Sequence, residues 1–332
     1  MGIIELNHQI ADDVMQLSGI TFVHASDMHA RRDLWDRMVQ FINHYADKIT
    51  FALHTGDYCG GSQQQYADMY QGMECLRPIL NCVGNHDCYT GEGPWLLCEK
   101  KKVYELLFSH RKNWDVTFFE CAHSMSYYKD FPGLRLIVLD DYYDTWQTRP
   151  WLRNVLREAY DLGLHVITAQ HEPTGYIQNT YGSLFHTMDD YISKFRQYEL
   201  NRTDYDFDHR GRVLYEDVIL EFMEYGGRFV CNLAGHDHVD EFGVTNAGVL
   251  NIAIQNGTSW DALGDTARVP GEKSEDCFNV MSVDTEKGQF TIIRIGADTD
   301  RYGRVKSKLI FDYLNKKIIE EKCTVPYDGY EV

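Results

Sequence analysis

Polar side chains with the potential for chemistry follow directly after short apolar runs of this sequence. The most informative case is Asn85-His86-Asp87, which follows the apolar run Pro78 to Val83 and the glycine Gly84. The run predicts a buried strand, and the glycine permits a sharp turn or a close approach of the backbone. An amide, an imidazole and a carboxylate then stand at the carboxyl end of a strand, the edge at which open α/β sheets bind ligands. Alone, the segment is equally compatible with a turn, because Asn and Asp favour turns.

The same arrangement occurs at five places in the chain, and their joint occurrence carries the argument. A lone Asp after a strand is usually a cap or turn residue, and a lone His is more often structural. Five strand ends that all carry Asp, His or Asn indicate one common site at the edge of a sheet. The candidate residues are Asp27, His29, Asp57, Asn85, His86, His171, His236 and His238.

These residue types favour a metal centre. Two carboxylates, one amide and several imidazoles without a thiolate form a mixed oxygen and nitrogen ligand set, which suits Mn²⁺, Fe or Zn²⁺ better than Cu(I) or iron–sulfur clusters. Asp27 and His29 are two residues apart, as are His236 and His238, so both members of a pair can face one ion from extended backbone. One carboxylate can bridge two ions about 3.5–4 Å apart, the separation typical of two-metal hydrolases.

The elements that must position these residues alternate in type. Strands predicted at 20–25, 49–53 and 78–83 are separated by helical patterns at 33–48 and 63–76, which indicates an α/β sheet with crossover helices. A second series of strands is expected at 116–120, 124–128, 134–139, 163–169 and 229–233. Helices are expected at 150–161, with Pro150 as the first helical residue, and at 215–225.

Two further segments complete this organisation. Residues 172–211 are polar and aromatic, and we expect a long insertion over the site, such as a lid. Short strands are predicted between 249 and 313. Because the sequence has no internal repeat, low-complexity tract or Gly/Ser linker, residues 1–332 are expected to form one catalytic domain.

Composition narrows the classes of partner. The net charge of −18 disfavours nucleic-acid binding, although it does not exclude a phosphorylated substrate, because bound metals can dominate the field inside a pocket. No run approaches the roughly 18 apolar residues that span a membrane. The nine cysteines form no Cys-x-x-Cys pair, and the N-terminal residues have no signal-peptide pattern, so the default expectation is a cytoplasmic protein with reduced thiols.

The order of the motifs is that of a known family. Asp-x-His, Gly-Asp, Gly-Asn-His-Asp, a lone His and Gly-His-x-His occur between Ile20 and Asp240, and this series resembles the calcineurin-like metallophosphoesterases. The resemblance implies a four-layer α/β/β/α sandwich with two mixed β-sheets, the second completed by the C-terminal strands at 249–313. It also implies two-metal hydrolysis of a phosphomonoester or phosphodiester of a small molecule.

Carried over residue by residue, the resemblance implies a role for each candidate. One ion would be held by Asp27, His29, Asp57 and His238, and the other by Asp57, Asn85, His171 and His236, with Asp57 as the bridge. His86 would stabilise the transition state or protonate the leaving oxygen, oriented by Asp87. A carboxylate that holds one ring nitrogen fixes the tautomer of a histidine and raises its pKa, which suits a general acid. The nucleophile would be a metal-bound hydroxide.

The sequence departs from the family pattern in two places, and neither removes a ligand. Asp237 stands where many members carry a small or neutral residue, and Asp57 is followed by Tyr58-Cys59-Gly60 without the extra carboxylate of some members. Two alternatives stay open. A nuclease is disfavoured by the acidic charge and the lack of a basic, aromatic-interleaved groove. A non-catalytic binding or scaffold protein is disfavoured because all eight candidate residues are intact.

Overall fold

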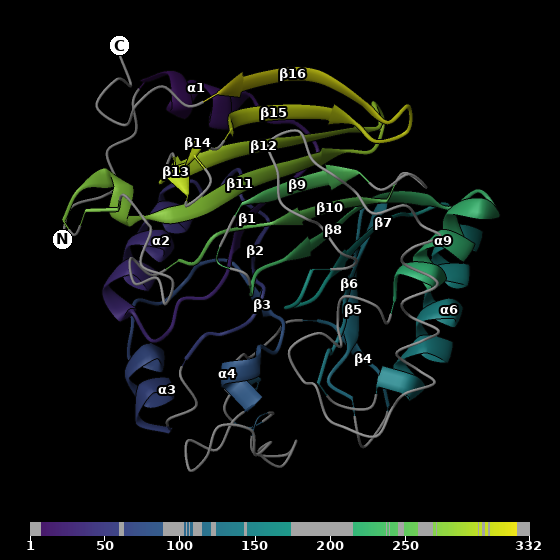
Figure 1. Ribbon diagram of the computed structural model, residues 1–332, viewed down its shortest axis with the longest axis horizontal. Helices are drawn as coiled ribbons and strands as arrows, with labels where there is room; N and C mark the ends of the chain where they lie inside the picture. The colour runs from purple at the N-terminus through teal and green to yellow at the C-terminus, as the bar shows by residue number, and fades with distance from the viewer. Residues whose placement is uncertain are drawn as a thin grey trace.

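Two seven-stranded sheets form the middle layers of the structure, a computed structural model, and helices cover their outer faces (Figure 1). This arrangement confirms the expected four-layer α/β/β/α sandwich. No helix in the described part of the chain is both long and apolar enough to cross a membrane. The structure describes residues 8–59, 63–88, 103, 105, 107–108, 115–120, 124–142, 145–173, 215–236, 238, 240–244, 249–257, 268–269, 271–297, 299–300, 303–304 and 306–323.

The first sheet has the strand order β16-β15-β12-β11-β1-β2-β3. Strand β1 pairs in parallel with β2 and antiparallel with β11, so the sheet is parallel from β1 to β3 and antiparallel from β1 to β16. The parallel strands are β1 (Ile20–Ala25), β2 (Phe51–His54) and β3 (Ile79–Asn81). The antiparallel strands are β11 (Cys277–Asp284), β12 (Gln289–Gly296), β15 (Lys306–Asp312) and β16 (Lys317–Cys323).

The second sheet has the order β4-β5-β6-β7-β8-β10-β9. Neighbours are parallel from β6 through β7 and β8 to β10, and the two edges are antiparallel. Its strands are β4 (Thr117–Phe118), β5 (Tyr127–Phe131), β6 (Leu134–Val138), β7 (His165–Ala169), β8 (Arg228–Ala234), β9 (Glu241–Val244) and β10 (Leu250–Ala253). A separate small hairpin joins β13 (Thr299–Asp300) and β14 (Gly303–Arg304).

The C-terminal strands differ from the expectation that they complete the second sheet. Among the described strands between 249 and 313, only β10 joins that sheet, whereas β11, β12 and β15 extend the first sheet from β1. The burial of β11 gives the physical reason, because seven of its eight residues, Cys277 to Val283, are buried. A strand covered on both faces belongs in the interior of a sheet, and the free edge of β1 provides that position.

Amphipathic helices cover the outer faces. In α2 (Arg32–His44) the buried side chains include Leu34, Met38 and Phe41, which recur at helical spacing. Helices α6 (Thr145–Asp161) and α9 (Glu216–Glu224) pack on the second sheet through a shared apolar cluster. Their companions on the other side are α1 (His8–Gln16) and α3 (Gln63–Tyr70) (Figure 1).

Two expectations about helices and loops have separate outcomes. Helix α6 begins at Thr145 and contains Pro150, so this proline is not the first helical residue. An interior proline removes one hydrogen bond of the helix, and the apolar face that α6 buries offsets this cost. The expected lid lies outside the described residues from position 174 to its end at 211.

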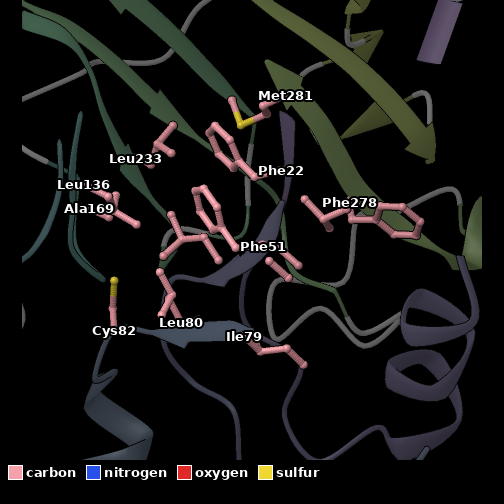
Figure 2. Close-up of a cluster of buried hydrophobic side chains, with 14 of the residues drawn as sticks. Phe22, Phe51, Ile79, Leu80, Cys82, Leu136, Ala169, Leu233, Phe278 and Met281 are labelled. Carbon is pink, nitrogen blue, oxygen red and sulfur yellow. The ribbon is translucent and has the colours of Figure 1, made fainter. Parts of the chain in front are cut away.

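The main core lies between the two sheets (Figure 2). Phe22 of β1 stacks on Phe51 of β2 with ring centroids 4.7 Å apart, and Phe51 stacks on Phe131 of β5 at 4.6 Å. Leu136 and Leu233 approach the same cluster from the second sheet. Close packing of this kind resists displacement, so the core holds the two sheets in a fixed relation beneath the ends of their strands.

Candidate metal centre

The predicted site residues follow five strands that belong to both sheets. Strands β1, β2 and β3 end before them in the first sheet, and β7 and β8 in the second. Backbone hydrogen bonds join the connecting loops: the amide of Asp27 donates to Gly56 O at 3.0 Å, and that of His29 to Asp57 O at 3.1 Å. The amide of Gly235 donates to His171 O at 2.9 Å. The carboxyl ends of the five strands therefore form one continuous edge.

A first group of ligand atoms surrounds the Asp27 carboxylate. Its Oδ1 atom lies 3.3 Å from His238 Nε2 and 3.9 Å from His29 Nε2, and these two nitrogens are 3.3 Å apart. Asp57 Oδ2 lies 3.9 Å from His29 Nε2. Asp27 Oδ1 is buried and accepts no hydrogen bond from the described residues. A buried carboxylate oxygen faced by imidazole nitrogens fits a bound cation. We name this group of ligand atoms the β1 position.

A second group lies beside it, around the Asn85 amide. Asn85 Oδ1 is 2.9 Å from His171 Nε2 and 3.1 Å from His236 Nδ1, and the two ring nitrogens are 3.2 Å apart. His171 Nδ1 lies 2.7 Å from Thr55 O. A carbonyl oxygen can only accept, so Nδ1 carries the donated proton and Nε2 faces the other ligands, as in most histidines that bind metal. We name this the β3 position.

Asp57 belongs to both groups. Its Oδ2 atom lies 3.9 Å from His29 Nε2 on one side and 3.5 Å from His171 Nε2 on the other. Its Oδ1 atom accepts a hydrogen bond of 2.8 Å from the amide of His86. The structure thus brings all seven predicted ligand residues together and sets one carboxylate between the two groups, which is the arrangement that two adjoining ions require.

Electrostatics reinforce this geometry. Burial alone would raise the pKa of Asp27, but neighbouring imidazoles, His238 foremost, hold that pKa well below its usual range. The pKa of Asp57 is lowered in the same way, chiefly by His171. Burial would lower the pKa of His171, yet the Asp57 carboxylate raises it well above its ordinary value. The carboxylates thus attract positive charge into the site, whether as protons or as a cation.

The ligand-bearing backbone adopts an uncommon conformation. Asp27, His29, Asp57, His236 and His238 have φ angles of +52°, +44°, +55°, +69° and +57°. Residues other than glycine rarely take such left-handed angles. Backbone strain of this kind persists only where the surroundings impose it, and it concentrates at functional sites. Five of the seven predicted ligands share it.

Gly84 shows why a glycine precedes the Asn-His-Asp segment. A Cβ atom at this position would lie 2.9 Å from Asp57 Cγ and closer still to Asp57 Oδ1 and the Asp57 amide. Any side chain here would displace the carboxylate shared by both positions. The tight approach of the two loops after β2 and β3 therefore depends on the missing Cβ.

His86 and Asp87 lie in α4 (Asn85–Cys88), a single helical turn, and occupy different surroundings. The His86 side chain is 47% exposed, and its Nε2 atom is 3.9 Å from Asp57 Oδ2. The buried Asp87 carboxylate accepts hydrogen bonds from Tyr66 Oη at 2.5 Å and from the amides of Gly84, Tyr58 and Cys59 at 3.0–3.3 Å. Burial, and then the charge of Asp57, raise the pKa of Asp87 to about 6.

The expected contact between Asp87 and the His86 ring is not among the hydrogen bonds of the Asp87 carboxylate to described residues. The helical backbone explains the difference, because adjacent residues of a helix point in different directions and do not face each other. Asp87 instead ties the loop after β3 to the loop after β2 and to α3.

Two residues of the site escaped the sequence analysis. Asp141 Oδ2 accepts hydrogen bonds of 2.9 Å from the amides of His171 and Glu172, which fixes the backbone beside a predicted ligand. It follows β6, the parallel neighbour of β7, so the rule that found the other strand ends would also have found it. Tyr66 lies in α3, where no local pattern marks it as a partner of Asp87. The unusual Asp237 lies outside the described residues.

The fold and the ligand arrangement together define an α/β protein with a candidate dinuclear metal centre. The model of the family described as calcineurin-like phosphoesterase matches residues 20–240, which is most of the chain. The chain therefore belongs to the calcineurin-like phosphoesterase family. The sequence matches no curated protein sequence.

Solved structures of similar fold accompany this match. A dimetal phosphatase from Danio rerio has a TM-score of 0.57 at 13% identity, over 88% of this chain and 98% of that chain. The GAP50 anchor of the Plasmodium inner membrane complex has a TM-score of 0.44 at 13% identity, over 92% and 88%. The NAD nucleotidase of Haemophilus influenzae has a TM-score of 0.40 at 8% identity, over 91% and 49%. At these identities the likeness concerns the fold alone.

Proposed function

We propose that this protein hydrolyses a phosphoester of a small molecule with two metal ions, Mn, Fe or Zn. The observation that carries the proposal is the location of Asp57 Oδ2 between the imidazoles of His29 and His171. Asp27, His29 and His238 would complete the β1 position, and Asn85, His171 and His236 the β3 position. The oxygen and nitrogen donors, without a thiolate, suit these metals.

The chain's own residues position the ligands and provide negative charge at the centre. When bound, two such ions lower the pKa of water and offset charge on a phosphoryl oxygen. Asp57 holds the two positions together, and its bond to the His86 amide fixes the start of α4 relative to them. Thr55 O and Asp141 orient His171 through its Nδ1 atom and its amide.

His86 is the proposed proton donor to the leaving oxygen. Its half-exposed ring can meet a substrate, whereas the Asp87 carboxylate is buried among backbone amides. Its Nε2 atom is 3.9 Å from Asp57 Oδ2, which sets it beside both metal positions. Removal of a positioned acid typically lowers the rate 10²–10⁴-fold. We therefore expect His86→Ala to keep both ions and lose most of the turnover.

The test compares two model esters. Metal-stripped protein is refilled with Mn²⁺ and assayed with p-nitrophenyl phosphate and bis-p-nitrophenyl phosphate, beside Asp57→Ala and the control Asp115→Ala. Asp115 suits the control because its carboxylate is exposed and pairs with Lys129. We expect Mn²⁺-dependent turnover in the wild type and the control, and none in Asp57→Ala. The ratio of the two rates assigns monoester or diester chemistry.

Metal content separates the competing outcomes. Two bound ions per wild-type chain without turnover of either ester would contradict the proposed activity and favour a binding protein. Turnover that persists in Asp57→Ala would contradict the role of the shared carboxylate. The acidic net charge of the protein disfavours a nucleic acid as the substrate, because it repels the phosphate backbone.

A further inference from the structure

An ion pair joins a buried arginine of the first sheet to Asp240, which lies two residues after His238. Arg294 lies in β12, its side chain is 3% exposed, and its guanidinium donates to Asp240 Oδ1. The second oxygen of Asp240 accepts a hydrogen bond of 2.6 Å from Gln255 Nε2. Asp240 stands two residues after His238, at the end of the turn that leaves β8. Asp240 is therefore held by Arg294 of the first sheet and by Gln255, which follows β10 of the second sheet.

The beginning of the same turn is fixed independently. The amide of Gly235 donates to His171 O at 2.9 Å, and the amide of His236 donates to Asp27 Oδ2 at 2.9 Å. His236 is therefore held at the end of β8, close to its own attachment. His238 lies farther along the turn, so the anchor at Asp240 is the nearer support for its left-handed backbone, which has a φ of +57°.

A second buried arginine braces the neighbouring loop against the same position. Arg268 is 6% exposed and donates to the carbonyl oxygens of Asn256 and Gly257. The amide of Gly257 in turn donates to Ser26 O at 2.7 Å, immediately before Asp27. The segment from Gln255 to Gly257 thus supports the β1 position from two sides, through Asp240 and through Ser26.

The β3 position has separate supports. Asp141 holds the backbone of His171, Thr55 O holds its ring, and Asn85 follows β3 at the far end of the first sheet. None of these contacts involves Arg294 or Asp240. A perturbation of the ion pair should therefore reach one metal position before the other.

We propose that Arg294 and Asp240 are positioning residues for the β1 position, formed by Asp27, His29, His238 and the shared Asp57. This inference rests on the proposed dinuclear centre. Through Arg294 it assigns a part of the site to β12, beyond the residues 20–240 that the family model matches. Arg294 and Asp240 would act through the backbone that carries His238. Loss of a residue that orients a metal ligand typically costs about 10–100-fold in metal affinity, and we expect such a loss at the β1 position alone.

The experiment measures Mn²⁺ binding by titration calorimetry, not turnover. Two backgrounds isolate the positions: Asn85→Ala leaves the β1 position, and His29→Ala leaves the β3 position. Adding Arg294→Met should raise the Mn²⁺ dissociation constant about 10–100-fold in the first background and leave it unchanged in the second.

The matched control is Arg135→Met. Arg135 is also a buried strand arginine paired with carboxylates, Asp130 and Glu158, but it lies in β6 and braces α6. Its removal should lower the melting temperature and leave Mn²⁺ affinity unchanged in both backgrounds. This control separates a general loss of stability from a specific loss at the β1 position.

The outcomes distinguish the two proposals. If the wild type binds no Mn²⁺, the proposed function fails, and the inference fails with it. If the wild type binds two ions, and folded Arg294→Met keeps its affinity in both backgrounds or loses it equally in both, the inference alone is overturned. If circular dichroism shows that Arg294→Met does not fold, Asp240→Asn, which keeps the shape of the side chain, is judged by the same criteria.

Discussion

Substitution of Gly84 by alanine offers a direct test of the geometry of the shared carboxylate. The added Cβ would lie 2.9 Å from Asp57 Cγ and nearer to Asp57 Oδ1, although real Cβ contacts essentially never fall below 3.0 Å. Relief of this overlap requires a shift of Asp57 on the order of 1 Å, and a misplacement of that size can cost about 100-fold in rate. We therefore expect Gly84→Ala to retain roughly 1% of the Mn²⁺-dependent turnover.

The assay is hydrolysis of bis-p-nitrophenyl phosphate at saturating Mn²⁺, with Mn²⁺ affinity measured in parallel. Gly163→Ala provides the control, because its Cβ would meet no atom within 4 Å while its φ of +69° still disfavours a side chain. The control should lose about 1–2 kcal/mol of stability and keep its turnover. Wild-type rates in a folded Gly84→Ala protein would refute the argument that this glycine sets the location of Asp57.

Three further expectations concern stability. Burial, and then the charge of Arg228, lower the pKa of His165 to about 4, so the folded state favours the neutral ring. The contribution of His165 to stability is therefore present above pH 6.5 and is lost as the pH falls toward 4. The loss should reach about 2 kcal/mol at pH 5 relative to pH 7, measured by urea unfolding, and His165→Gln should reduce it. Tyr66→Phe removes the hydrogen bond to Asp87 and should lower the unfolding free energy by about 2 kcal/mol; an unchanged urea midpoint would contradict this. A chelator should lower the melting temperature of the Mn²⁺-loaded wild type, since ligands stabilise the state they bind, but should leave Asp57→Ala unaffected.

The location of the site could be predicted because each strand and the polar group after it are local features. An apolar run ended by a glycine or an acidic residue is readable within about ten residues, as at Asp57 and Asn85. Parallel strands must then bring their carboxyl ends to a common edge. The β-α-β alternation of the N-terminal region was sufficient for the residues after β1, β2 and β3, whereas those after β7 and β8 belong to the second sheet.

Other features depend on contacts that no local pattern contains. The pairing of β1 with β11 joins Ile20 to Val283 across most of the chain, so the sequence near either strand does not reveal it. The family resemblance implied that Asp87 orients His86, but adjacent residues of the helical turn α4 do not face each other. Arg294 lies in an apolar strand, and only the packed structure shows that it meets Asp240.

The pairing of β1 with β11 also bears on how the protein is made. During synthesis β1 leaves the ribosome long before its partner on one side, Cys277–Asp284. Until then one edge of β1 remains open, and unpaired strand edges are prone to wrong association. A nascent chain that ends near residue 240 would carry all the predicted ligands and still lack β11, the antiparallel neighbour of β1 in the first sheet. We therefore expect chaperone dependence to be greatest for translation intermediates that contain all the predicted ligands but not β11.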